Sequence, residues 1–411
     1  MIGLTLVHRI KEDILSGKAT VLVLVTVVLM CASTALTIGE LTRRQAIYEA
    51  NAARQQDLVT LLRRPELLSV LIRGVDAEIY GGKGVAGVNV ERVPSPAYEN
   101  PLLALFPTPD IGFIAQYILS LFALMMAFDV AAGPKERRTL SLIFSNPVSR
   151  IGFFLGQCLG SYLTLAVAFL LGLLGSVAIL LATGVGTLDG QVMMRIAAIA
   201  FVTLVYLAVF FMVGAMISAS TASSSRAFIA SLLTWAVLVL VVSPLLMLLA
   251  GHVRRIPSIE VVTAEMNAAR NQILSKEKAF VTEWPKANQA TEAIEARYAK
   301  QVAAQEALMK TASRLSPAAS YTLATTALAG TSSDGAERYL DEVRAYISRL
   351  RRFVYIEQEH DRRAAQPVFF RRTESLAAAL SHAAPDAALL LLWLIGFGFL
   401  ALRRFLRYDL R

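Results

Sequence analysis

The sequence predicts an all-α polytopic membrane protein that crosses a bilayer six times. Mean hydropathy is +0.55, and 55% of the 411 residues are hydrophobic while only 17% are charged. Soluble domains do not have this composition. The apolar residues also gather in runs of about 20 or more, which is the length that a helix needs to cross the hydrocarbon of a bilayer.

The apolar runs define six expected spans: 19–39, 111–132, 151–183, 192–217, 227–250 and 385–402. The third would measure about 50 Å as a straight helix, more than a bilayer needs. We therefore expect it to tilt, to begin in the interface, or to break near Gly172 and Gly175. Pro244 predicts a kink near the end of the fifth span.

Residues 1–18 predict an amphipathic helix that lies along the membrane surface before the first span. Its apolar side chains recur at helical spacing and its charged ones fall on the other side, with Leu4, Val7, Ile10 and Ile14 opposite Arg9, Lys11, Glu12 and Asp13. The alanine-rich end of 19–39 also fits a signal peptide. The long segment that leads into it favours a retained anchor.

Two polar inserts separate the spans. The first, 40–110, is helical in character over 40–66, and its glycine and proline content over 70–96 suits turns and a small β hairpin. The second, 252–384, has acidic and basic residues four positions apart with Ala and Leu between them. This pattern is typical of helices with one packing stripe and a solvated face. We expect a mainly helical domain there.

Lysine and arginine counts predict that both termini are cytoplasmic. With that orientation, three of these residues lie inside in 1–18, four in 133–150, one in 218–226 and four in the basic tail 403–411. The short loop on the other side, 184–191, has none, and long inserts do not count in this rule. Both inserts are then extracytoplasmic, in a bacterial inner membrane, and the loop 133–150 is cytoplasmic.

Motifs for catalysis, metal binding or nucleotide binding are not found in the sequence. GGKG at 81–84 lacks the spacing of a nucleotide-binding loop. Cys31 and Cys158 both lie in apolar segments, and the four histidines are scattered. We expect no catalytic residue, no metal site and no cofactor held by this chain. The net charge of +9 follows from topology, so we expect no nucleic-acid partner.

Ionisable residues are rare within the predicted spans, which argues against an ion-coupled transporter. Asp129 lies near the inner end of the second span, and Arg195 lies at the outer start of the fourth. Asp129 would either face a cavity or, as we favour, cap the interface near Arg137 or Arg138. Gly152, Gly156 and Gly160 repeat every four residues in the third span, and this smooth face fits packing within the chain or a dimer contact equally well.

The loop 133–150 carries the most specific pattern of the sequence. Breaks at Gly133-Pro134 and Asn146-Pro147 predict a short helix from about Pro134 to Phe144 that lies along the membrane face. Around this helix a set of positions forms one recurring pattern: Asp129, Glu136, Arg137, Thr139, Leu140, Ser145, Pro147, Val148, Ser149, Arg150 and Gly156.

These positions resemble the signature of the ABC-2 type permeases, which are the membrane subunits of ATP-binding-cassette exporters. Arg138 stands where that family usually has Gly, and Gln157 where it usually has Lys. The six spans and the amphipathic N-terminal helix extend the resemblance over most of the membrane part. The two large extracytoplasmic inserts resemble a subgroup of these permeases.

The resemblance implies that the loop forms a coupling helix that docks in a groove of a separate ATPase. The residues that would make this contact are Lys135, Glu136, Arg137, Arg138, Thr139 and Leu140. Two ATPase subunits would then bind the ATP and Mg²⁺, and two permeases, identical or sister chains, would form the pathway. The other interpretation of the loop is a basic segment that binds anionic membrane lipid.

We expect a permease subunit that exports a lipid-like, peptide or other amphipathic substrate, and no enzymatic activity in this chain. The second insert would gate the exit or bind an extracytoplasmic partner. A different class of function is also open, namely a membrane-anchored scaffold or sensor whose inserts bind a partner while no solute crosses. Copurification of an ATPase discriminates between these two functions.

Overall fold

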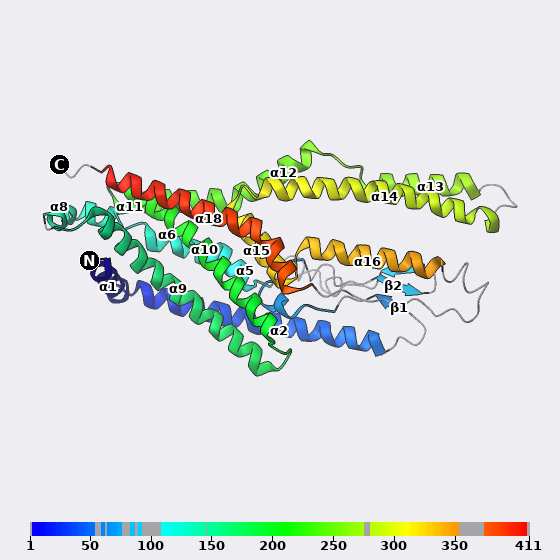
Figure 1. Cartoon of the computed structure of the whole chain (residues 1–411), viewed down its shortest axis with the longest axis horizontal. Helices are drawn as coiled ribbons and strands as arrows, with labels where there is room; N and C mark the ends of the chain where they lie inside the picture. The colour runs from blue at the N-terminus through cyan, green and yellow to red at the C-terminus, as the bar shows by residue number, and fades with distance from the viewer. Residues whose placement is uncertain are drawn as a thin grey trace. The chain divides into compact units, whose positions relative to one another are not determined.

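The computed structural model confirms an all-α polytopic architecture with six helices long and apolar enough to cross a membrane (Figure 1). It describes residues 2–53, 59–61, 64–75, 83–86, 89–92, 108–145, 147–274, 280–352 and 374–408. The six spans are Lys18–Ala50, Ile111–Glu136, Arg150–Thr183, Gly190–Ser220, Ser224–Val253 and Leu376–Leu406. The chain divides into two compact units, of which unit 1 contains 1–236 and 320–411 and unit 2 contains 237–319.

Unit 1 is built around the fourth span, α10 (Gly190–Ser220). Its large side chains Tyr206, Phe210 and Phe211 are fully buried. It packs against α6 (Ser120–Ala127) of the second span and α18 (Leu376–Leu406), while α9 (Arg150–Thr183) packs against α1 (Ile2–Leu15) and α2 (Lys18–Ala53). Both termini of the chain lie at the same end of unit 1 (Figure 1).

The third span is an unbroken helix, α9, and so the break near Gly172 and Gly175 does not occur. Both glycines instead accommodate side chains of α2. A Cβ on Gly172 would lie 2.5 Å from the sulfur of Met30, and one on Gly175 would lie 2.8 Å from Cys31 Sγ. The missing side chains let the two helices approach closely, which explains why glycine occurs here without a kink.

Two spans contain π-helical segments. In the second span, α5 (Ile111–Phe113) is followed by the π segment η3 (Ile114–Leu119). In the fifth, η4 (Ala236–Val241) lies between α11 (Ser224–Trp235) and α12 (Val242–Val253). Pro244 has no N–H to donate to the carbonyl four residues earlier, and η4 directly precedes it. The irregularity predicted from Pro244 is therefore present as a π segment.

The first insert contains the predicted hairpin within 70–96, formed by β2 (Lys83–Ala86) and β3 (Asn89–Arg92). The strands are antiparallel, with Val85 opposite Val90. A third strand, β1 (Val59–Leu61), pairs with β2. The prediction of helix over 40–66 was wrong for these three residues, because α2 ends at Ala53 and the chain returns to pair with the hairpin.

The second insert is helical, as predicted, but it is not one domain. Unit 2 holds α12, α13 (Ile259–Leu274) and α14 (Phe280–Ser313). Within it, Gln305 Nε2 donates to the Gly251 and Arg254 carbonyl oxygens at 3.3 and 2.6 Å and so ties α14 to the end of the fifth span. Most of α15 (Pro317–Ala329) and all of α16 (Ser333–Arg352) belong to unit 1.

The last span begins earlier than predicted. Helix α18 starts at Leu376, where Ser375 Oγ caps the helix by accepting from Ala378 N, and Pro385 lies inside the helix.

Candidate functional site

The segment predicted as one coupling helix forms two short helices, α7 (Ala132–Glu136) and α8 (Thr139–Phe144). The break falls at Arg138, whose φ of 53° makes it the only non-glycine residue with a left-handed backbone in the described part of the chain. A side chain in this conformation clashes with its own backbone, and glycine does not. Arg138 therefore occupies a position whose backbone favours the glycine of the family pattern.

The second span also breaks just before α7. A turn at Phe128–Ala131 separates α6 from α7. The hydroxyl oxygen of Ser218 on α10 accepts from the backbone N–H groups of Ala131 and Ala132 at 3.0 and 2.9 Å. These donors are buried, and leaving them unpaired would be costly. Ser218 thus fixes the start of α7 to the fourth span.

Three of the six predicted coupling residues point into the chain. Lys135 is buried, and its Nζ donates to the Ala219 carbonyl at 2.5 Å at the end of α10. Leu140 is only 3% exposed. Glu136 is exposed, and its Oε2 accepts from Ser224 N at 2.9 Å, which is the first residue of α11. Lys135 and Glu136 therefore join α7 to the ends of the fourth and fifth spans.

The exposed face of this segment, which we call the docking face, comprises Arg137, Arg138, Ser141 and Leu142. Leu142 is 70% exposed, and the guanidinium of Arg137 is also 70% exposed, with Glu12 at 3.5 Å. Thr139 is half-buried beside them. The sequence predicted Leu140 as the apolar docking residue, but α8 turns Leu142 outward instead.

The second half of the motif forms the start of the third span. Ser149 caps α9 by accepting from Gly152 N at 3.1 Å. The Arg150 guanidinium lies 5.7 Å from the centre of the Phe144 ring. Ser145 and Pro147 are exposed, Val148 is half-buried, and Gln157 is buried on α9. Asn146, which was predicted to help end the helix, lies outside the described residues.

Asp129 lies in the turn between α6 and α7 and pairs with two cations of the N-terminal region. Its Oδ1 is 2.6 Å from Arg9 Nη2, and its Oδ2 is 2.7 Å from Lys18 Nζ. The predicted interfacial cap near Arg137 or Arg138 was therefore wrong, because α1 brings Arg9 to this carboxylate and so replaces the solvent that the cap required.

Arg9 is the centre of a buried network that joins α1 to the second and third spans. Its Nε donates to Ser161 Oγ at 2.6 Å and lies 3.4 Å from Asp13 Oδ1. Ser161 in turn donates to Asp13 Oδ2 at 2.8 Å. We call Arg9, Asp13, Lys18, Asp129 and Ser161 the anchor cluster. Two cations face two anions here, so the buried charges balance.

The two α1 members of the anchor cluster have shifted pKa values. Burial raises the pKa of Asp13, against the effect of Arg9 and Ser161. Burial lowers the pKa of Arg9, but the neighbouring Asp129 and Asp13 outweigh it and raise that pKa overall. Arg9 therefore stays charged at every physiological pH, and the cluster keeps its cation.

Helix α1 is amphipathic as predicted, but its charged side is not solvated. Arg9 and Asp13 are 4% and 1% exposed, while Leu4 and Leu15 on the apolar side are 80% and 86% exposed. The apolar side of α1 is thus the free one, as an interfacial helix requires. The charged side packs against α9.

The three glycines of the third span face α1. A Cβ on Gly156 would overlap Thr5, and one on Gly160 would lie 2.8 Å from the Cβ of Arg9 and 2.9 Å from the Leu6 carbonyl. A Cβ on Gly152 would lie 3.6 Å from Ile2. Of the two alternatives left open by the sequence, the contacts match packing within the chain, with α1 as the partner.

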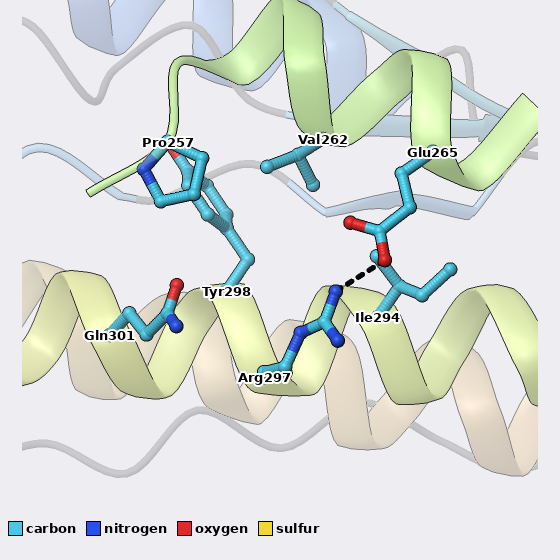
Figure 2. Close-up of a pocket in the computed structure, with 7 residues that line it drawn as sticks. All are labelled: Pro257, Val262, Glu265, Ile294, Arg297, Tyr298 and Gln301. Atoms are coloured by element: carbon cyan, nitrogen blue, oxygen red, sulfur yellow. Dashed lines mark hydrogen bonds and ion pairs between the residues drawn. The ribbon is translucent and has the colours of Figure 1, made fainter.

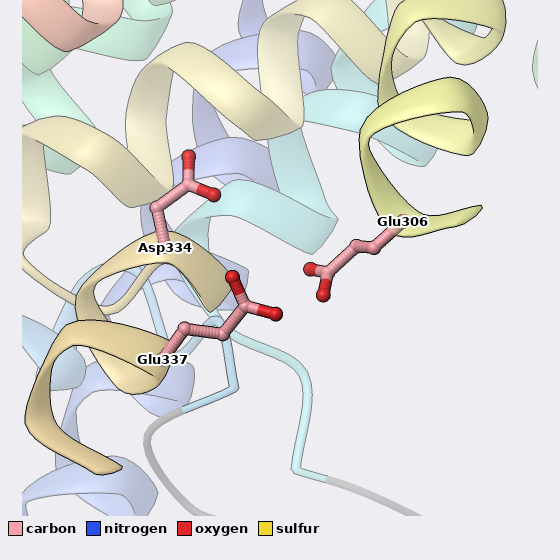
Figure 3. A group of neighbouring side chains, drawn as sticks. All are labelled: Glu306, Asp334 and Glu337. Atoms are coloured by element: carbon pink, nitrogen blue, oxygen red, sulfur yellow. The ribbon is translucent and has the colours of Figure 1, made fainter. Parts of the chain in front are cut away.

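Two other groups of side chains do not form a binding site. In unit 2, a cavity of about 220 Å³ lies between α13 and α14, and the Arg297–Glu265 ion pair of 2.5 Å crosses it (Figure 2). Ligand pockets are usually larger, about 300–1,000 Å³. Figure 3 draws Glu306 of α14 with Asp334 and Glu337 of α16. These belong to different units, and acidic clusters without an ion are common.

Comparison with family models now identifies the chain. The model described as "ABC-2 family transporter protein" matches residues 5–410. The chain belongs to this family. It is therefore the multi-pass membrane permease of an ABC transporter, a transport component that is not itself catalytic, and the family works with an ATPase partner. Comparison with curated proteins found no match.

Sequence reasoning missed four residues of this ABC-2 permease's coupling end: Arg9, Lys18, Leu142 and Ser218. Arg9 and Asp13 stand four residues apart beside an intramembrane acid, which is a usable signal. Leu142 could not be distinguished from Leu140 without the break at Arg138. Ser218 gave no signal, because one serine in an apolar span is common.

Proposed function

We propose that this ABC-2 permease docks its ATPase through the docking face of α8 and exports an amphipathic substrate as a dimer with an identical or sister permease. The observation that carries the proposal is an exposed leucine and two exposed arginines on a segment held rigidly from behind. Leu142 and Arg137 are 70% exposed, while Lys135, Glu136 and Leu140 on the same segment are engaged within the chain.

The rigid backing is what makes this surface suited to mechanical coupling. Ser218, Lys135 and Glu136 attach α7 to the ends of the fourth and fifth spans. The contact of Arg137 with Glu12 adds a link to α1. A displacement of the docking face by an ATPase would therefore move several spans together, and a flexible lipid-binding loop would have no need of these contacts.

Topology supports a cytoplasmic position for this face. The lysines and arginines of the short segments gather at the end of unit 1 that carries both termini and α8 (Figure 1). This agrees with the positive-inside rule. In a bacterial inner membrane, the first insert and unit 2 would then lie on the extracytoplasmic side, where a partner protein could bind them.

The spans support a dimer and an apolar pathway. The fifth span is the least buried and the fourth the most buried. Leu233 and Leu248 of the fifth span are 63% and 62% exposed. Such a face needs lipid or a second permease to cover it. The shortage of ionisable residues in the spans favours a lipid-like, peptide or other amphipathic substrate over an ion.

Copurification tests the docking face. We expect a tagged chain to retain an ATPase from native membranes, and Leu142→Asp or Arg137→Glu with Arg138→Glu to lose it. Leu315→Asp is the matched control for the leucine, because Leu315 is 64% exposed in unit 2. Arg255→Glu is the control for the arginines, because Arg255 is also exposed. Retention of the ATPase by the α8 variants would refute the docking face.

A transport assay separates the exporter from the scaffold. The permease–ATPase complex in liposomes should move a fluorescent amphipath only when it hydrolyses ATP. A chain that binds an extracytoplasmic partner but retains no ATPase and drives no transport would be the scaffold or sensor.

A further inference from the structure

Helix α15 is too short to cross a membrane, yet it is buried against the spans. It has 13 residues, and a crossing helix needs about 20. In its unit 1 part, Tyr321, Ala324, Thr325 and Leu328 are at most 1% exposed. The sequence had assigned this stretch to an extracytoplasmic insert, and the contacts correct that assignment.

The side chains near the start of α15 contact polar groups within two spans. Tyr321 Oη lies 3.2 Å from the hydroxyl of Thr203, and its ring stacks on Tyr206 with 4.4 Å between centroids. Both partners lie in the middle part of α10. Thr322 Oγ1 donates to Gln116 Oε1 at 2.9 Å, and Gln116 lies in the second turn of the second span. Helix α15 therefore reaches below the ends of these spans.

The same contacts reach both π-helical segments. Gln116 lies in η3, and its carbonyl accepts from Tyr206 Oη at 3.0 Å. One turn later, Ser120 Oγ accepts from Trp235 Nε1 at 2.9 Å, directly before η4 of the fifth span. Irregular helical turns in spans need such side-chain partners, and π segments are frequent at functional sites.

The far end of α15 is fastened separately. Arg195 donates to the Leu328 carbonyl at 3.2 Å and to the Glu374 carbonyl at 2.6 Å. Gly330, with φ of 74°, ends the helix. Thr331 then donates its hydroxyl to the Ile72 carbonyl at 3.1 Å. Arg195, which the sequence marked as an isolated intramembrane charge, thus holds α15 and the segment before α18 together.

We propose that α15 is the outer gate of this permease, closed in this structure by the Tyr321–Thr203 and Thr322–Gln116 contacts. The inference rests on the proposed transport function. Opening the gate lifts Tyr321 away from Tyr206 and Thr203, while Arg195 and Thr331 keep the far end of α15 attached. The two π segments are the points at which the second and fifth spans rearrange, because the contacts that α15 releases hold their irregular turns.

Cysteine labelling tests the gate. Thr203→Cys, in a chain with Cys31→Ala and Cys158→Ala, places a thiol under Tyr321 at a position that is fully buried. A membrane-impermeant maleimide applied from the extracytoplasmic side of the complex in liposomes should label it slowly without nucleotide and at least about fivefold faster during ATP hydrolysis. Val209→Cys, which is equally buried on the same helix, should stay unlabelled in both conditions.

A second variant makes the test independent of the ATPase. Tyr321→Phe keeps the ring on Tyr206 and removes only the hydroxyl. It should raise the labelling of Thr203→Cys without nucleotide about fivefold, the population shift that one lost hydrogen bond gives. Labelling that changes in neither experiment overturns the gate. Failure of an ATPase to copurify overturns the docking face, and the Tyr321→Phe result still decides the gate.

Discussion

Replacing Asp129 with Asn tests whether the anchor cluster holds α1 by charge balance. In the native chain Asp129 faces Arg9 at 2.6 Å and Lys18 at 2.7 Å, and the Arg9 side chain is 5% exposed. The Asn variant leaves two cations with Asp13 as their only buried anion. Removing one partner of a buried pair costs about 3–5 kcal/mol.

The exposure of the partners sets the expected value within this range. Side-chain exposure is 15% for Asp129 and 38% for Lys18, so solvent screens part of the excess charge. We therefore expect Asp129→Asn to lower the free energy of unfolding by about 3 kcal/mol, at the low end for a buried pair. Adding Lys18→Met restores charge balance and should recover about half of that loss.

Denaturation of the purified chain in detergent micelles measures both effects. Glu12→Gln is the matched control, because the Glu12–Arg137 pair spans 3.5 Å between side chains that are 38% and 70% exposed. It should change stability by less than about 1 kcal/mol. A loss below about 1 kcal/mol for Asp129→Asn, or a double variant no more stable than the single one, would refute the charge-balance argument.

Three further predictions follow from the same end of the chain and from the start of the second span. Arg138→Gly should raise the free energy of unfolding by about 0.5–1 kcal/mol, because glycine adopts the left-handed conformation without strain, and Arg138→Ala, which keeps the strain, should give no gain in the same denaturation assay. Gly156→Ala should cost about 1–3 kcal/mol because its Cβ overlaps Thr5, whereas Gly39→Ala, with nothing within 4 Å, should cost nothing. Burial raises the pKa of Asp110 above its ordinary value of 3.8. The folded state therefore binds more protons, and this contribution to stability is complete below that value and is lost as pH rises through the folded pKa. Titrating stability from pH 4 to 7 should show this loss in the native chain and not in Asp110→Asn, and parallel curves would contradict it.

The sequence was sufficient for the spans because bilayer thickness translates directly into apolar run length. It could not predict features that depend on contacts between distant segments. Gly172 and Gly175 looked like helix breakers until Met30 and Cys31 were found against them. The strand Val59–Leu61 looked helical because its partner β2 comes more than 20 residues later.

The candidate site was predicted correctly in location and incorrectly in the orientation of its side chains. Charge and proline content placed the loop at a membrane face, but one left-handed residue, Arg138, decides that Leu140 points inward and Leu142 outward. The partners of Asp129 were missed for a similar reason. Pattern analysis assigned Arg9 to solvent, and the glycines of α9 instead let α1 approach and bury it.

The second span is the element that connects the two proposed moving parts. It is not a continuous α-helix, because η3 interrupts it near one end and the turn at Phe128–Ala131 near the other. Between them α6 is a regular helix of 8 residues that packs against α10. Gln116 binds Tyr206 and α15 at the first irregularity, and Asp129 binds Arg9 at the second. A push on the docking face therefore acts at one joint, moves α6 as a rigid piece, and arrives at the residues that hold α15 closed.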